Sequence, residues 1–103
     1  MSDKIRDENI DYLFKAILSL KDERECYNFF EDLCTIKEIH DMSQRLDIAV
    51  LLEQGYNYVK ISETVGVSAA TITRVNRALN YGADGYRTAL DRINGKEMHN
   101  DDQ

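Results

Sequence analysis

The chain has 103 residues, of which 43% are hydrophobic and 31% charged, a composition typical of a soluble globular domain. One domain with a modest core suits this length, and no apolar run is long enough to cross a bilayer. The N-terminal stretch also lacks the apolar core of a signal peptide. We therefore expect a cytoplasmic protein without a membrane association.

The net charge of −6 is distributed unevenly along the chain. Residues 1–55 hold 7 Lys and Arg against 13 Asp and Glu, whereas residues 56–103 hold 6 of each kind. Within residues 56–81, Lys60, Arg74 and Arg77 are opposed only by Glu63. The acidic excess thus lies outside residues 56–81, so this segment can still bind a polyanion such as DNA. The acidic excess also limits nonspecific binding of the whole chain to DNA.

The cysteine and histidine residues do not indicate a disulfide scaffold or a metal site. Cys26 and Cys34 form no CxxC pair, and we expect both to be reduced. His40 and His99 lie too far apart for a zinc-binding spacing. We expect no metal and no cofactor.

The first part of the chain shows the apolar period of two amphipathic helices. The apolar positions are Ile10, Leu13, Phe14, Ile17 and Leu18 in the first helix and Cys26, Phe29, Phe30 and Leu33 in the second. The pairs Asp22 with Glu25 and Thr35 with Glu38 have capping-box spacing, which predicts helix starts near residues 22 and 35. At helical spacing, the aromatic residues of this part are expected in a core, with a protein-binding face as the alternative; they are Tyr12, Phe14, Tyr27, Phe29 and Phe30.

A third helix is predicted from about Ile36 to Gln54, ending at Gly55, which tolerates the positive φ of a helix C-terminus. Apolar residues surround the axis of its second half and should be buried on all sides; they are Leu46, Ile48, Ala49, Val50, Leu51 and Leu52. A monomer of this size could hardly enclose them. We therefore expect a homodimer in which the third helices share a core with the first two.

Three shorter helices are predicted after Gly55, at about residues 57–65, 69–80 and 84–93. Tyr86, Ala89, Leu90 and Ile93 give the last of them its apolar stripe. We predict a single domain over residues 1–94 and a polar, disordered tail over residues 95–103.

Residues 57–80 have the organisation of a helix-turn-helix. Ile61 and Val65 face inward, and Ser62 is small enough for the second helix to approach closely. Gly66 gives the turn its backbone freedom, Val67 fills the corner, and Ser68 is the expected N-cap. The second helix is anchored at spacings of three and four by Ile72, Val75 and Leu79. The alternative is that the two helices are an ordinary part of a helical bundle.

The opposite side of the second helix presents short side chains followed by positive charge, which suits close approach to base edges and phosphates. Thr73 can hydrogen-bond a base or a phosphate, while Arg77 and Lys60 suit phosphates. The predicted DNA-binding residues are Lys60, Ser68, Ala69, Ala70, Thr73, Arg74 and Arg77.

At these residues the sequence resembles the tryptophan repressor superfamily, whose recognition helix carries the string seen here as Ala69 to Arg74. It is similar more closely to the Trp-repressor-like proteins of the YerC/YecD group, and the resemblance covers about Asp32 to Leu79. It implies an all-α, six-helix intertwined homodimer whose two helix-turn-helix units meet successive major grooves of a double-stranded DNA operator. The implied function is transcriptional regulation, and we expect a repressor.

In the family, tryptophan binds between the central helix and the recognition helix and sets the tilt of the latter. The resemblance places its contacts at Thr35, Arg45 and Arg74, all of which keep the family's residue types. Val75 instead replaces the glycine that makes room for the indole, and Ala78 replaces a serine that holds the amino group. Because a β-branched side chain should fill the slot, we expect Val75 to act as a permanent plug and tryptophan not to be the corepressor. A small-molecule effector of another kind is left open.

Several alternatives stay open at this point. Arg45 and Arg74 could be satisfied by carboxylates such as Asp41 or Glu38 instead of a ligand. Tyr58 and Val59 stand where the repressor has polar and basic residues, which implies a different operator. We expect no enzyme, because no catalytic set accompanies His40. The competing function is a helical protein-interaction module that acts on a regulatory partner.

Overall fold

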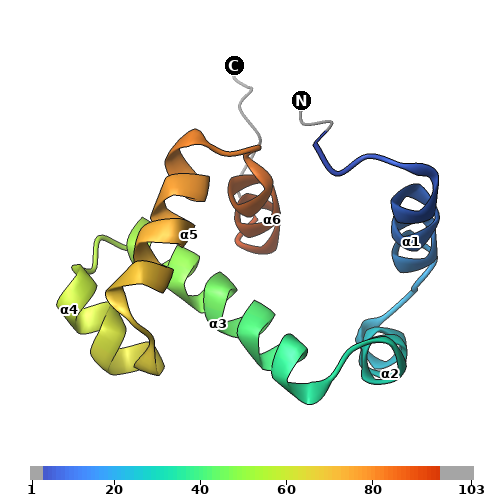
Figure 1. Ribbon diagram of the computed structural model, residues 1–103, viewed down its shortest axis with the longest axis horizontal. Helices are drawn as coiled ribbons and strands as arrows, with labels where there is room; N and C mark the ends of the chain where they lie inside the picture. Colours follow the sequence, from blue (N-terminus) through green and yellow to red (C-terminus); the bar gives the residue numbers. More distant parts are fainter. Residues whose placement is uncertain (1–3, 96–103) are drawn as a thin grey trace. The chain divides into compact units, whose positions relative to one another are not determined.

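The computed structural model describes residues 4–95, which form α-helices and one short π-helical segment, with no strand among them (Figure 1). The predicted all-helical class is confirmed. The elements are α1 (Glu8–Leu18), α2 (Glu23–Leu33), α3 (Ile36–Glu53), α4 (Tyr58–Ile61), η1 (Ser62–Gly66), α5 (Ala69–Tyr81) and α6 (Gly85–Ile93). Apart from Gly95, the tail predicted to be disordered lies outside the described residues.

Two compact units divide the chain between Asp41 and Met42, inside α3. The single folding domain predicted for residues 1–94 stays a prediction. Within residues 4–95, no helix combines the length and the apolar character that crossing a membrane requires.

Side-chain caps start each helix of the first unit. The carboxylate of Asp7 accepts a hydrogen bond from the Ile10 N–H at 2.8 Å, and that of Asp22 accepts one from the Glu25 N–H at 2.9 Å. These caps satisfy backbone donors that have no partner within the first turn. The helix start predicted near residue 22 is confirmed.

The apolar faces of α1 and α2 are not buried in the chain by itself. No residue of either helix falls in the buried class, and Leu18 is 83% exposed. Of the five aromatic residues expected in a core, Tyr12, Phe14 and Tyr27 are exposed, while Phe29 and Phe30 are half-buried and meet edge to face. The single chain therefore does not form the core predicted for this part.

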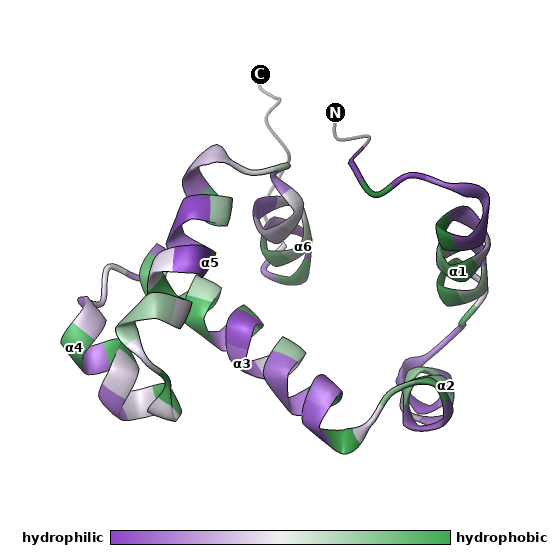
Figure 2. Cartoon of the chain, viewed as in Figure 1, coloured by the Kyte–Doolittle hydropathy of each residue, from purple (hydrophilic) through white to green (hydrophobic). Residues whose placement is uncertain are grey.

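Helix α3 ends in the manner predicted, at a glycine with positive φ. The N–H of Gly55, at φ +88°, donates to the Leu52 carbonyl, and the N–H of Tyr56 donates to the Leu51 carbonyl. This is the Schellman pattern, which satisfies the last carbonyls of a helix. Figure 2 shows that α3 is mainly hydrophilic in its first half and becomes hydrophobic toward this end.

The core of the second unit joins the C-terminal half of α3 to α4, α5 and α6. Its buried members are Ile48, Ala49, Ile61, Ile72, Val75, Leu79 and Leu90. The second half of α3 is not buried on all sides in the single chain, and the burial that we expect from a dimer stays a prediction. Val50, Leu51 and Leu52 are half-buried and Leu46 is exposed, because one unit of this size covers only one side of the helix.

Two shorter helices differ in detail from the prediction. The helix expected over residues 57–65 is α-helical only to Ile61, and η1 continues it as a wider π-helical turn to Gly66. The last helix begins at Gly85, one residue after the predicted start. Its N-cap, Asp84, has φ +65° and makes no side-chain capping bond.

Candidate nucleic-acid interface

The turn between η1 and α5 is set by one glycine and one hydroxyl. Gly66 has φ +81°, a conformation that costs a residue with a side chain more than it costs glycine. A Cβ at Gly66 would meet no atom within 4 Å, so the backbone angle and not the space is the reason for glycine. The Ser62 hydroxyl, predicted only to be small, also donates to the Val67 carbonyl across the turn at 2.6 Å.

Helix α5 starts at the predicted N-cap. The Ser68 hydroxyl accepts from the Thr71 N–H at 3.3 Å, and the two hydroxyl oxygens lie 3.3 Å apart. The preceding helix has an equivalent cap, in which the Asn57 side chain accepts from the Lys60 N–H at 2.9 Å. Both α4 and α5 therefore start at a side-chain cap.

The inner face of α5 is held by apolar packing. Ile72 and Val75 are 0% and 1% exposed, and Leu79 is also buried. They pack in one cluster with Ile48 of α3 and Ile61 of α4, with Val65 and Val67 at its edge. The predicted anchors of the second helix are confirmed as buried residues, and they fix which side of α5 faces outward.

The outward side of α5 is open, as predicted from its pattern. Each of the candidate residues is exposed: Lys60 on α4, Ser68 at the N-cap, and Ala69, Ala70, Thr73, Arg74 and Arg77 on α5. Within residues 4–95, Lys60, Arg74 and Arg77 form no ion pair, so their charges are directed to solvent or to a ligand. This surface offers short side chains, a hydroxyl and free cations, groups that can contact base edges and phosphates.

The residues predicted for an effector pocket lie in different surroundings. Thr35 is in the first unit, where its hydroxyl accepts from the Glu38 N–H at 3.1 Å and its own N–H donates to the Glu38 carboxylate at 2.8 Å. This reciprocal capping box confirms the helix start predicted near residue 35 and gives Thr35 a structural task. Arg45, Arg74 and Ala78 are exposed, whereas Val75 is buried.

The suggested pairing of Arg45 with Asp41 is wrong. Lys37, one helical turn before Asp41, donates to the Asp41 carboxylate at 2.9 Å, while the Glu38 carboxylate accepts from the Thr35 N–H. With both nearby carboxylates occupied, Arg45 forms no ion pair with any described residue.

A hollow of about 360 Å³ opens beside Ala78, between the end of α5 and α6. Three alanines, one glycine and one tyrosine line it: Ala78, Ala83, Ala89, Gly85 and Tyr86. Ala78 is the only member of the predicted effector pocket among these lining residues. Among the described residues, no group of three or more His, Cys, Asp or Glu side chains could hold a metal ion.

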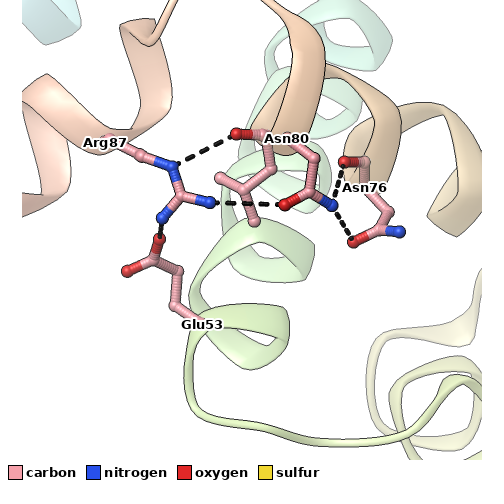
Figure 3. Close-up of polar contacts among 5 residues, drawn as sticks. Glu53, Asn76, Asn80 and Arg87 are labelled. Carbon is pink, nitrogen blue, oxygen red and sulfur yellow. Dashed lines mark hydrogen bonds and ion pairs between the residues drawn. The ribbon is translucent and has the colours of Figure 1, made fainter.

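One polar network at the end of α5 was missed by the sequence reasoning. Arg87 of α6 reaches the Glu53 carboxylate at 2.5 Å, the Leu79 carbonyl at 3.2 Å and the Asn80 side chain at 3.5 Å (Figure 3). Glu53 and Arg87 lie 34 residues apart, so no helical spacing could have indicated this pair.

Comparison with known proteins identifies close relatives over nearly the whole chain. The model of the Trp repressor protein family matches residues 8–94. The uncharacterized protein YerC of Bacillus subtilis (strain 168) is 55% identical over 95 residues, which cover 92% of this chain and 91% of YerC.

Two crystal structures share the fold. A TrpR-like protein from Eubacterium eligens ATCC 27750 has a TM-score of 0.86 and 48% identity, covering 94% of this chain and all of that one. A candidate Trp repressor from Staphylococcus aureus has a TM-score of 0.84 and 50% identity, covering 89% of this chain and 92% of that one.

The capping role of Thr35 leads to a stability prediction. Replacing it by alanine, T35A, removes the acceptor for the Glu38 N–H and should lower the free energy of unfolding by about 1 kcal/mol. Urea denaturation at one fixed protein concentration measures the change. T35S keeps the hydroxyl and is the matched control, expected to stay within about 0.5 kcal/mol of the parent chain. Equal stability of T35A and T35S would contradict the structural role.

Proposed function

Because the chain belongs to the Trp repressor family, we propose that it is a sequence-specific DNA-binding transcriptional regulator that acts as a repressor. In this proposal α4, η1 and α5 are a helix-turn-helix, and α5 enters the major groove. The observation that carries the proposal is the contrast between the two sides of α5. One side is locked into the core, and the other presents small side chains and unpaired cations.

The chemistry of the outward side suits recognition of a duplex. Ala69 and Ala70 let the start of α5 approach base edges, where a methyl group can contact a thymine methyl. Thr73 supplies a hydroxyl within the next turn, and Arg77 and Lys60 supply charge for the flanking phosphates. The relatives are bacterial, and a bacterial DNA-binding regulator works in the cytoplasm, so the proposal places the protein there.

A homodimer is the second part of the proposal. The apolar stripes of α1 and α2 have the period of a buried face but contain no buried residue in the single chain. The exposed side of α3 near Leu46 is likewise apolar. A second copy of the chain would cover these surfaces and would present two helix-turn-helix units to two half-sites. The same exposed residues are what a protein-interaction module would offer, so oligomeric state and DNA binding must both be measured.

The third part of the proposal is that tryptophan does not regulate this protein. Val75 is 1% exposed and packs with Ile48 and Ile61 in the core cluster. Its side chain therefore has a structural position of its own at the place where the family resemblance puts a glycine. An indole at this place would have to displace packed atoms, which typically costs 1–3 kcal/mol or more. Effectors of other shapes are left open.

The dimer proposal is tested with L18E. Leu18 lies on the apolar stripe of α1 and is 83% exposed in the single chain, so a charge there should leave the chain's own fold intact. A dimer would bury this carboxylate without an oppositely charged partner, so the monomer–dimer equilibrium should shift toward the monomer. Sedimentation equilibrium of the full chain measures this shift. K15Q makes the same change in charge at a residue of α1 outside the apolar stripe and should stay dimeric. A monomeric parent chain would contradict the proposal.

DNA binding is tested by selecting duplexes from a random pool with the full chain and then measuring affinity for the selected duplex. T73A and R77A should each weaken binding, by about 1–3 kcal/mol if the side chain contacts a base. R92A is the control, because it removes a cation from α6, outside the proposed helix-turn-helix of α4, η1 and α5. For R77A, a phosphate contact would also lower the slope of log affinity against log salt by about 1.

Two results would reject the helix-turn-helix assignment. In the first, T73A and R77A bind the selected duplex as tightly as the parent chain. In the second, no duplex is enriched. If no duplex is enriched and the chain instead forms a complex with a protein whose affinity does not depend on salt, the protein-interaction module is supported.

Tryptophan binding is tested by calorimetry. The parent chain should give no saturable heat at micromolar tryptophan, because Val75 occupies the slot. V75G, which restores the family's residue, is the comparison variant. It should be less stable, because it removes a buried side chain and because glycine in a helix costs about 1 kcal/mol relative to alanine. Stoichiometric micromolar binding to the parent chain would show that Val75 does not act as a plug.

A further inference from the structure

Arg87 connects three helices of the second unit (Figure 3). It projects from α6, and its guanidinium reaches Glu53 at the last residue of α3. Its Nε donates to the Leu79 carbonyl, and one of its terminal nitrogens lies 3.5 Å from the Asn80 side-chain oxygen. Leu79 and Asn80 belong to the last turn of α5. One side chain therefore joins the C-terminal ends of α3 and α5.

The chemistry of arginine fits this place. The last four carbonyls of a helix lack an intrahelical donor, and the helix end carries partial negative charge. The Leu79 carbonyl is one of these groups, and the guanidinium gives it both a donor and a positive charge. Glu53 adds a charge-assisted hydrogen bond on another side of the planar group. Lysine, with a single ammonium group, does not present this fixed set of donors.

The contacts continue along α5 toward the proposed reading head. The Asn80 amide nitrogen donates to the Asn76 carbonyl at 3.0 Å and lies 3.1 Å from the Asn76 side-chain oxygen. Asn76 is three residues after Thr73 and one before Arg77, within one helical turn of both. The network formed by Glu53, Arg87, Asn80 and Asn76 thus runs from the end of α3 to the middle of α5.

We propose that Arg87 is a positioning residue, which fixes the orientation of α5 on α3 and so presets the DNA-facing side without a small-molecule ligand. The apolar packing of Ile72, Val75 and Leu79 decides which side of α5 faces outward. It does not by itself fix the tilt of the helix, because apolar contacts are non-directional. The hydrogen bonds of Arg87 are directional and close the free end of α5 against α3 and α6. The effect on DNA rests on the proposed function, whereas the effect on α5 does not.

The first experiment does not involve DNA. Hydrogen–deuterium exchange of the full chain is compared for the parent, R87Q and R92Q, which remove the same charge from the same helix. R87Q should speed exchange in the C-terminal half of α5 by about tenfold, the factor expected for one charge-assisted hydrogen bond. Exchange in α1 and α2 should not change. Equal exchange in R87Q and R92Q, or a uniform rise over all helices, would overturn the positioning role.

The second experiment measures affinity for the selected duplex, and it depends on whether a substitution strengthens or weakens binding. Removing a negative charge normally strengthens binding to DNA, and E63Q, at an exposed residue of η1, should do so. E53Q removes the same charge but also the charge assistance of the hydrogen bond from Arg87, so it should weaken binding, by about tenfold. R87Q also loses the contacts with Leu79 and Asn80, so it should weaken binding at least as much, and R87Q combined with E53Q should be no worse than R87Q alone.

The salt dependence separates positioning from direct contact. Positioning leaves the slope of log affinity against log salt unchanged in R87Q, whereas loss of a phosphate contact lowers it by about 1. Stronger binding of E53Q, or a lower slope in R87Q, would overturn the inference. If the parent chain selects no duplex, the proposed function fails, and hydrogen exchange alone decides whether Arg87 positions α5.

Discussion

The packing of α5 against the second half of α3 is the contact on which the rest of the candidate site depends. A helix has no preferred outward side until one side is buried, and here Ile72, Val75 and Leu79 are buried with Ile48 and Ala49. Every exposed group on α5 takes its direction from this contact. Val75 is part of this packing, and the family resemblance aligns it with the glycine that makes room for the indole.

The two units of the chain differ in how much they bury by themselves. The second unit has a closed apolar cluster, a glycine turn and side-chain caps, which together define the helix pair of the candidate interface. The helices of the first unit are well capped but bury nothing completely. This contrast is expected of a small chain that completes its core by association, since local hydrogen bonds form within one chain while burial requires surface from elsewhere.

Two kinds of interaction act on α5, and each fixes a different property of the helix. Apolar burial selects the inner face, and the polar network around Arg87 joins the end of the helix to α3 and α6. In the family as the resemblance describes it, a ligand sets the tilt of the recognition helix. In this chain, Val75 is buried on the inner face of α5 and Arg87 holds the end of the helix. The orientation of α5 in the proposed regulator would therefore be set without a ligand.

The sequence by itself determined the helices, the caps at Asp22, Thr35 and Ser68, the turn at Gly66, and the anchors and exposed side of α5. These features depend on residues within one or two helical turns, where spacing and residue type are sufficient. Tertiary structure decided the rest. Spacing also left one local choice open: Asp41 pairs with Lys37, one helical turn before it, and not with Arg45, one turn after it. Arg87 meets Glu53 only because folding brings together helix ends separated by 34 residues, a distance along the chain at which no periodic pattern operates.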